Sequence, residues 1–173
     1  NGGLHLTVSD TGWMKSMWGK LYGQWFCGSA VFVYDMEKFV PEKLLKKISH
    51  YKVTTFCAPP TIYRFLVNED LSQYDLSSVQ YATTAGEALN PETFNTFKKI
   101  TGLTIMEAFG QTETTVLTLN PVGTTPKVGS MGRPSPLYDV DLVDADGNQV
   151  PPGEVGEIVF HIPEDGEQIG LFN

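Results

Sequence analysis

Short apolar runs alternate along this chain with segments that have the spacing of amphipathic helices. The apolar runs are rich in β-branched and aromatic residues, which is typical of strands, and they lie at residues 29–34, 53–57, 79–84 and 103–106. The intervening segments predict helices over residues 39–50, 61–68 and 90–101. The unit repeats roughly every 25 residues, an order typical of layered α/β folds. The sequence therefore predicts a mostly parallel sheet with flanking helices.

Residues that favour helix ends support these boundaries. Pro41 lies near the start of one predicted helix, and Asn90-Pro91 offers a cap and a first-turn proline to another, which Gly102 would end. An earlier helix is expected after Asp10 or Thr11, carrying an apolar stripe of Trp13, Met17, Leu21 and Trp25. In the helix at 61–68 the residues expected to face inward are Ile62, Phe65 and Leu66.

The pattern changes after Asn120. Residues 121–136 are rich in Gly, Pro and Thr, and two alternating runs at 140–143 and 155–160 then flank the turn signal of residues 144–148. This predicts an antiparallel hairpin. We expect two units: an α/β subdomain over residues 1–128, and part of a small antiparallel, barrel-like β unit over residues 129–173.

Charge and composition exclude several classes of function. The net charge of −8 argues against nucleic acid as a partner, because proteins that bind phosphate backbones normally carry a basic patch. There is no apolar run of about twenty residues to span a membrane. Cys27 and Cys57 lie in apolar surroundings, which favours reduced thiols in a cytoplasmic protein over a disulfide or a reactive thiol. None of the three histidines is assigned a role.

The stretch from Glu107 to Thr115 has the residues expected of a chemical site. It follows the predicted strand at 103–106, and ligands of open α/β sheets collect at the carboxyl ends of strands. Gly110 would let the chain turn and approach a ligand. The amide of Gln111 and the hydroxyl of Thr112 suit a phosphate, and the carboxylate of Glu113 suits Mg²⁺. The same residues also fit the cap and first turn of a helix.

A second loop is expected at the same edge of the sheet. It begins at Gly86, directly after the predicted strand at 79–84. Right-handed crossovers place the carboxyl ends of parallel strands together, so this loop and the stretch from Glu107 should face one crevice. A tight turn at Gly86 and a solvated acid at Glu87 would explain the two residues without any function.

Four stretches, in this order along the chain, resemble the adenylate-forming enzymes. They are Ser9-Asp10-Thr11-Gly12-Trp13, Thr84-Ala85-Gly86-Glu87-Ala88-Leu89, Phe109-Gly110-Gln111-Thr112-Glu113 and Gly129-Ser130-Met131-Gly132-Arg133-Pro134. The sequence of these stretches is most similar to that of medium-chain acyl-CoA synthetases. The resemblance implies that the complete protein joins a carboxylic acid to AMP from ATP with Mg²⁺, and then transfers the acyl group to coenzyme A.

The resemblance also implies roles for individual residues. Thr112 would bind the α-phosphate or the acyl-adenylate, and Glu113 would bind Mg²⁺. Trp13 would line the acyl pocket. Gly110 would leave that pocket open, because acetate-specific relatives hold a tryptophan there. The residues expected to bind the nucleotide are Gly86, Glu87, Ala88, Glu107, Ala108, Phe109, Gly110, Gln111 and Thr112, with the Phe109 ring able to pack on adenine.

Several parts of the family pattern are not found in these 173 residues. They are the phosphate loop that ends in Pro-Lys, the downstream Thr-Gly-Asp, the hinge and the catalytic lysine of a mobile C-terminal domain; Lys127 and Arg133 do not match these motifs. We therefore expect an inactive fragment whose partners include the other domains of the same polypeptide. The alternative is a non-catalytic α/β binding module. An aryl or amino acid substrate also remains open.

Overall fold

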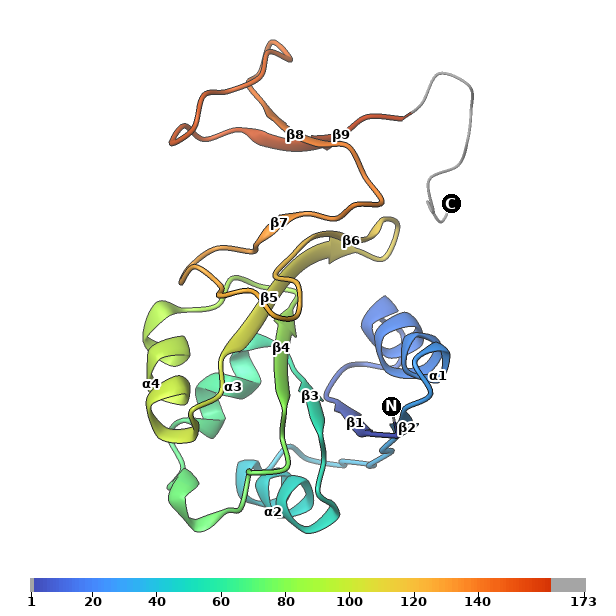
Figure 1. Ribbon diagram of the computed structural model, residues 1–173, viewed down its shortest axis with the longest axis vertical. Helices are drawn as coiled ribbons and strands as arrows, with labels where there is room; N and C mark the ends of the chain where they lie inside the picture. Colours follow the sequence, from blue (N-terminus) through green and yellow to red (C-terminus); the bar gives the residue numbers. More distant parts are fainter. Residues whose placement is uncertain (1, 163–173) are drawn as a thin grey trace.

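A seven-stranded sheet forms the centre of the computed structural model, which describes residues 2–162 (Figure 1). The strand order is β2-β1-β3-β4-β5-β6-β7, and the first five strands are parallel. Strands β6 and β7 run antiparallel to their neighbours. The bounds are β1 Leu4–Thr7, β2 Ala30–Val31, β3 Thr55–Cys57, β4 Tyr81–Ala85, β5 Ile105–Gln111, β6 Thr115–Leu119 and β7 Arg133–Pro134.

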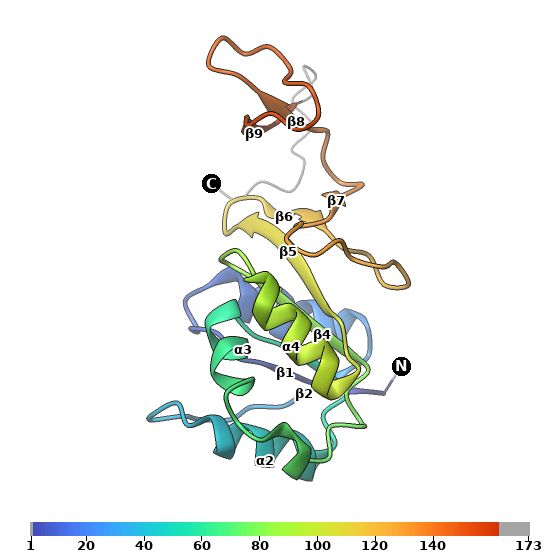
Figure 2. The ribbon, with the colours of Figure 1, turned by 90° about the vertical axis from the view of Figure 1, so that its left-hand side faces the viewer.

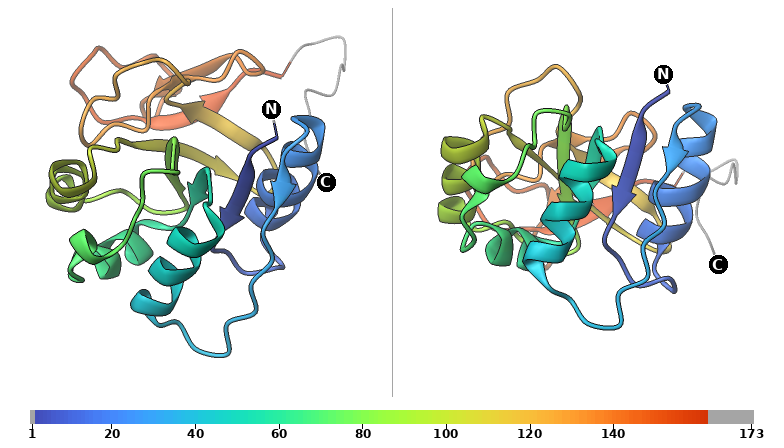
Figure 3. Two further views of the ribbon diagram at one scale, coloured as in Figure 1. Left: turned by 60° about the horizontal axis from the view of Figure 1, so that its bottom comes forward. Right: turned by 90° about the horizontal axis from the view of Figure 1, so that it is seen from below.

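Helices connect the parallel strands, as the sequence predicts. The helical elements are η1 Lys15–Tyr22, α1 Gly23–Phe26, α2 Pro41–Tyr51, α3 Pro60–Leu66, η2 Leu71–Gln73 and α4 Pro91–Thr101. Helices α3 and α4 lie in front of the strands in Figure 2. In both views of Figure 3, β1 runs between α2 and the η1–α1 segment. The strand order therefore reverses direction at β1, which makes a switch point between β1 and β3.

One apolar core lies between the sheet and helices α2, α3 and α4. Every strand from β1 to β5 except β2 contributes to it, through Leu6, Phe56, Ala82 and Ile105. Helix α2 contributes Leu44, Leu45 and Ile48, while Tyr63, Phe94 and Phe97 come from α3 and α4. Burial of the Leu, Ile and Phe side chains, each worth about 1.5–3 kcal/mol relative to exposure, holds the parallel strands in register.

Helices α2 and α4 confirm the boundary signals. Pro41 and Pro91 both lie in the first turns, and the Asn90 side chain accepts a hydrogen bond from Glu92 N at 2.7 Å. Gly102 ends α4 in the left-handed conformation, with φ of 74°. One inward-facing assignment was wrong: Phe65 of α3 is 45% exposed and packs against Phe39 outside the core.

The expected helix after Asp10 differs from the prediction. Residues 15–22 form a π-helix, so the α-helical spacing does not place the apolar stripe on one buried face. Trp13, Met17 and Trp25 are 55%, 50% and 60% exposed. Asp10 does not cap the helix, because its carboxylate accepts from Gly12 N at 2.7 Å and its carbonyl accepts from Ser16 Oγ at 2.8 Å.

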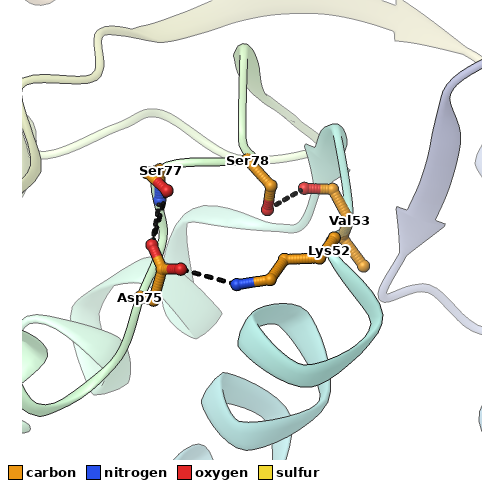
Figure 4. A network of polar contacts seen from close by, with 5 residues as sticks. All are labelled: Lys52, Val53, Asp75, Ser77 and Ser78. Carbon is orange, nitrogen blue, oxygen red and sulfur yellow. Dashed lines mark hydrogen bonds and ion pairs between the residues drawn. The ribbon is translucent and has the colours of Figure 1, made fainter.

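A polar network lies at the end of the sheet where β3 and β4 begin (Figure 4). Lys52, left-handed at the end of α2, pairs with Asp75 at 2.5 Å, and Asp75 accepts from Ser77 N at 3.0 Å. The Ser78 hydroxyl donates to Val53 O at 2.9 Å. These contacts tie the segment before β4 to the residues before β3.

The second small sheet confirms the predicted hairpin. Strand β8 (Val140–Val143) pairs antiparallel with β9 (Glu157–Phe160). Strand β7 still pairs with β6, so the first sheet extends beyond residue 128. The division at 128 and 129 therefore stays a prediction, and residues 163–173 of the second unit lie outside the described part. Among residues 2–162, no helix is both long and apolar enough to cross a bilayer.

His5 is a buried neutral imidazole on the face of β1 opposite Leu6. It is 6% exposed, and its ring nitrogens lie 2.7 Å from Thr55 Oγ1 and 2.6 Å from Thr7 Oγ1. Burial, together with the charge of Lys20, lowers the pKa of His5 to about 4. The imidazole therefore resists protonation in the folded chain but not in the unfolded chain.

We expect acid to destabilise the fold through His5. Well above pH 6.5 the imidazole is neutral in both states and makes no pH-dependent contribution. As pH falls from 6.5 toward 4 the unfolded chain takes up the proton first, so unfolding at pH 5 should cost about 2 kcal/mol less than at pH 7. Urea unfolding at both pH values measures this. His5→Gln should lose most of the difference, whereas the exposed His161→Gln should keep it; equal slopes in the two variants would contradict the assignment.

Candidate functional site

Two exposed loops follow neighbouring parallel strands at the open edge of the sheet. Strand β4 ends at Ala85, which is paired with Ala108 of β5, and residues Gly86, Glu87 and Ala88 follow it with exposed side chains or backbone. Strand β5 continues beyond this pair to Gln111 and is followed by a turn over residues 112–114. The expectation that both loops lie at one edge is thus confirmed. The turn, however, lies further along β5 than the sequence suggests.

The loop after β4 is fastened at both ends by carboxylates. Glu87 Oε1 accepts from Thr61 Oγ1 at 2.6 Å and from Thr61 N at 3.1 Å, and these bonds lower the pKa of Glu87. At the other end, Leu89 N donates to Glu107 Oε1 at 3.0 Å. Glu107 is only 5% exposed. Both side chains that were expected at the adenine wall therefore hold the loop, which leaves the backbone of residues 86–88 open to a ligand.

The turn over residues 112–114 presents two polar side chains to solvent. Thr112 and Glu113 are exposed and form no hydrogen bond or ion pair among the described residues, whereas Thr114 is buried. The Thr114 hydroxyl accepts from Gln111 N at 3.2 Å. A hydroxyl and a carboxylate without protein partners are free to bind a phosphate and a hard cation. No helix follows, so the helix-cap alternative is wrong: Thr115 begins the antiparallel strand β6.

The residue that follows this turn, Thr115, has a strained backbone that Tyr138 supports. Thr115 has φ of 61°, a conformation that β-branched residues seldom adopt. The Tyr138 hydroxyl donates to Thr114 O and lies 2.9 Å from Thr115 Oγ1. Backbone strain that surrounding contacts maintain is common at functional sites. Tyr138 was not identified from the sequence, because nothing in its surroundings marks a contact with a residue 24 positions away.

Gly110 lies inside β5 rather than in a turn, which corrects the sequence expectation. The β5–β6 register shifts between Phe109 and Gly110, and a Cβ on Gly110 would lie 1.7 Å from Thr115 O. The absence of a side chain is therefore required by the approach of β6, and not by a turn. A larger residue at 110 would have to displace this backbone before it could enter a pocket.

The remaining site residues divide into two groups. Ala108 and Phe109 belong to β5, next to the loop after β4, and Gln111 is exposed where β5 ends. Trp13 precedes η1 and is 55% exposed, so it is not part of the core; no described contact joins it to the two loops. Its assignment to an acyl pocket stays a prediction.

One residue that sequence reasoning missed reaches into this edge from η1. The Lys15 ammonium donates to Ala85 O at 2.5 Å, at the end of β4, and would lie 3.5 Å from a Cβ on Gly86. Burial lowers its pKa. No local pattern predicts a contact across 70 positions. The signal in hindsight is a lysine directly after the Ser9–Trp13 stretch.

Known proteins resemble this chain in sequence. Residues 4–164 match the family model described as AMP-binding enzyme. The mitochondrial acyl-coenzyme A synthetase ACSM3 of Homo sapiens is 43% identical over 165 residues, covering 95% of this chain and 28% of its own length. Homo sapiens ACSM5, also named a mitochondrial acyl-coenzyme A synthetase, is 44% identical over 155 residues, which are 90% of this chain and 27% of its length.

Solved structures share the same fold. The anthranilate CoA ligase AuaEII, determined with anthranoyl-AMP, has a TM-score of 0.84 and 30% identity, covering 92% of this chain and 31% of its own. An acyl-CoA synthetase from Brucella canis has a TM-score of 0.82 and 27% identity, covering 91% of this chain and 30% of its own. The chain thus spans 27–31% of the length of these four proteins, and its α/β architecture is that of the two solved structures.

Proposed function

This chain belongs to the AMP-binding enzyme family, and we propose that it is the central part of an AMP-forming acyl-CoA synthetase. The observation that carries the proposal is that two exposed loops lie at one sheet edge. One exposes its backbone at residues 86–88, and the other presents Thr112 and Glu113, which have no partner among residues 2–162. Relatives over 40% identical carry the name acyl-coenzyme A synthetase, which supports this choice over a non-catalytic binding module.

In the proposed reaction the complete protein uses ATP, a carboxylic acid and coenzyme A as substrates. The backbone of residues 86–88 and the Phe109 ring bind adenine. The Thr112 hydroxyl donates to the α-phosphate, where negative charge develops during transfer. The Glu113 carboxylate would hold Mg²⁺, which would neutralise phosphate charge when bound.

We propose that this chain contributes one part of the active site and that other segments of the polypeptide contribute the rest. Glu87 and Glu107 hold the adenine loop through bonds to Thr61 and Leu89. Other segments of the same polypeptide contribute the phosphate loop and the catalytic lysine. We further propose that residues 129–162 start the small β unit. Whether the protein acts in the cytoplasm, as its thiols suggest, or in mitochondria, as the names of the human relatives state for those proteins, is decided by fractionation of cells.

The proposal is tested on the full-length protein with ATP, Mg²⁺ and coenzyme A. A panel of acids from acetate through decanoate, with benzoate as the aryl representative, is supplied one at a time. Pyrophosphate is measured without coenzyme A, and the thioester is measured by mass after it is added. We expect acid-dependent pyrophosphate release followed by thioester formation. If no acid in the panel elicits pyrophosphate, the binding-module alternative replaces the enzyme.

A tryptophan at position 110 is expected to have two separable effects. Because a Cβ there would collide with Thr115 O, Gly110→Trp should destabilise the protein by about 1–3 kcal/mol as the bulge moves. If the displaced ring then enters the acyl pocket, preference among the acids should shift toward acetate and propionate. Gly110→Ala controls for the bulge, since it adds the collision without the ring. Unchanged chain-length preference in a folded Gly110→Trp protein would contradict the assignment of Gly110 to the acyl pocket.

A further inference from the structure

Lys15 brings a positive charge to the carboxyl edge of the sheet at the point where the strand order reverses. It extends from the first turn of η1 to Ala85 O, and it lies close enough to Glu87 for the charge of that carboxylate to affect it. Crevices at such switch points are where open α/β sheets bind ligands. The ammonium thus lies beside the loop of residues 86–88 at this edge of the sheet.

Among the described residues, no ion pair neutralises the charge of Lys15. Its ammonium donates instead to a neutral carbonyl, Ala85 O. The Glu87 carboxylate already accepts two bonds from Thr61. Burial lowers the pKa of Lys15, and the nearby Glu87 carboxylate offsets only part of that effect. A half-buried cation without a counterion is stabilised when an anion binds beside it.

Exposed backbone lies next to the ammonium. Gly86, with φ of 110°, has no Cβ, and a Cβ at this position would have Lys15 Nζ as its nearest neighbour, at 3.5 Å. Gly86, Glu87 and Ala88 are exposed. An oxyanion that approached residue 86 would therefore meet the remaining protons of the ammonium.

We propose that Lys15 binds an oxyanion of the adenylation substrates, either the carboxylate of the acid or the α-phosphate of the nucleotide. The inference rests on the proposed function. Its physical content is a charge-assisted bond from Nζ to a carboxylate or phosphate oxygen. Loss of such a bond should weaken binding of that substrate about ten- to a hundredfold.

The test uses the full-length protein with Lys15→Met, which removes the charge and the donor. Lys15→Gln removes the charge but can still donate to Ala85 O, so it separates ligand binding from the tie between η1 and β4. Lys99→Met, on the exposed side of α4, controls for the change of net charge. KM for ATP and KM for the best acid of the panel are measured by pyrophosphate release, AMP binding by calorimetry, and folding by Tm.

Each outcome decides the proposal. A higher KM for the acid alone, in both Lys15 variants, identifies the carboxylate. A higher KM for ATP with a matching loss of AMP affinity identifies the phosphate. Both KM values within twofold of wild type overturn the proposal, as do losses in Lys15→Met that accompany a lower Tm and are restored in Lys15→Gln. If the wild type releases no pyrophosphate, the proposed function fails, and unchanged AMP affinity in both variants then overturns the role of Lys15 as well.

Discussion

Replacing Glu113 by alanine in the full-length protein is expected to lower acid-dependent pyrophosphate release about a hundred- to a thousandfold. The carboxylate is exposed at the turn between β5 and β6 and forms no bond within the described structure. Its removal should therefore leave the fold intact while taking away a ligand for the cation that accompanies the phosphates. The loss should appear in kcat/KM for ATP at saturating acid, with Tm unchanged.

The matched control for this variant is Glu154→Ala. Glu154 is also exposed, but it lies in the turn before β9, away from both loops. It should retain wild-type rates. Thr112→Ala should lower the rate of pyrophosphate release as Glu113→Ala does, since the two residues share the turn and the proposed phosphate. Wild-type rates in both site variants would place the phosphates somewhere else.

Replacing Tyr63 by alanine is expected to reduce the free energy of unfolding by about 3–5 kcal/mol. Tyr63 is 0% exposed, and its ring makes edge contacts with Phe56 and Phe97 at centroid distances of 5.5 and 5.2 Å. Its hydroxyl donates to Thr83 O at 3.0 Å, in the middle of β4. The ring thus joins α3, α4 and the strand that positions the loop of residues 86–89.

Two further variants test whether the loss comes from the buried ring of Tyr63. Tyr63→Phe keeps the ring and should lose only about 0.5–1.5 kcal/mol for the hydrogen bond. Phe65→Ala, on the same helix, should cost less than Tyr63→Ala because Phe65 is 45% exposed. Urea unfolding measures all three. Equal losses for Phe65→Ala and Tyr63→Ala would contradict the assignment of Tyr63 to the core.

The fold was predictable wherever local chemistry sets an element. Helix α4 has its Asn90 cap, its first-turn Pro91 and its left-handed Gly102 in sequence order, so its bounds could be read directly. Strand β6 was missed, because Thr115–Leu119 follows residues that suit a helix start and only pairing with β5 decides between the two. The π-helix at Lys15–Tyr22 was also missed, since its spacing imitates an ordinary amphipathic helix.

The candidate site was predictable as two loops, but not as a set of contacts. The motif residues follow strands, and parallel strands bring their carboxyl ends together. The hydrogen bonds that hold the loop after β4 join residues that are distant in sequence. Glu107 accepts from Leu89 N, Thr61 donates to Glu87, and Lys15 donates to Ala85 O. The reason for Gly110 was also misread, because the collision that excludes a side chain involves a strand which the sequence did not reveal.

The decisive measurement is a crystal structure of the full-length protein with a bound acyl-adenylate. We expect adenine against the backbone of residues 86–88, the phosphate within hydrogen-bonding distance of Thr112 Oγ1, and the acyl group leading away from the β5–β6 bulge. A nucleotide bound elsewhere, with both loops still open to solvent, would contradict the proposal that this sheet edge is the adenylation site.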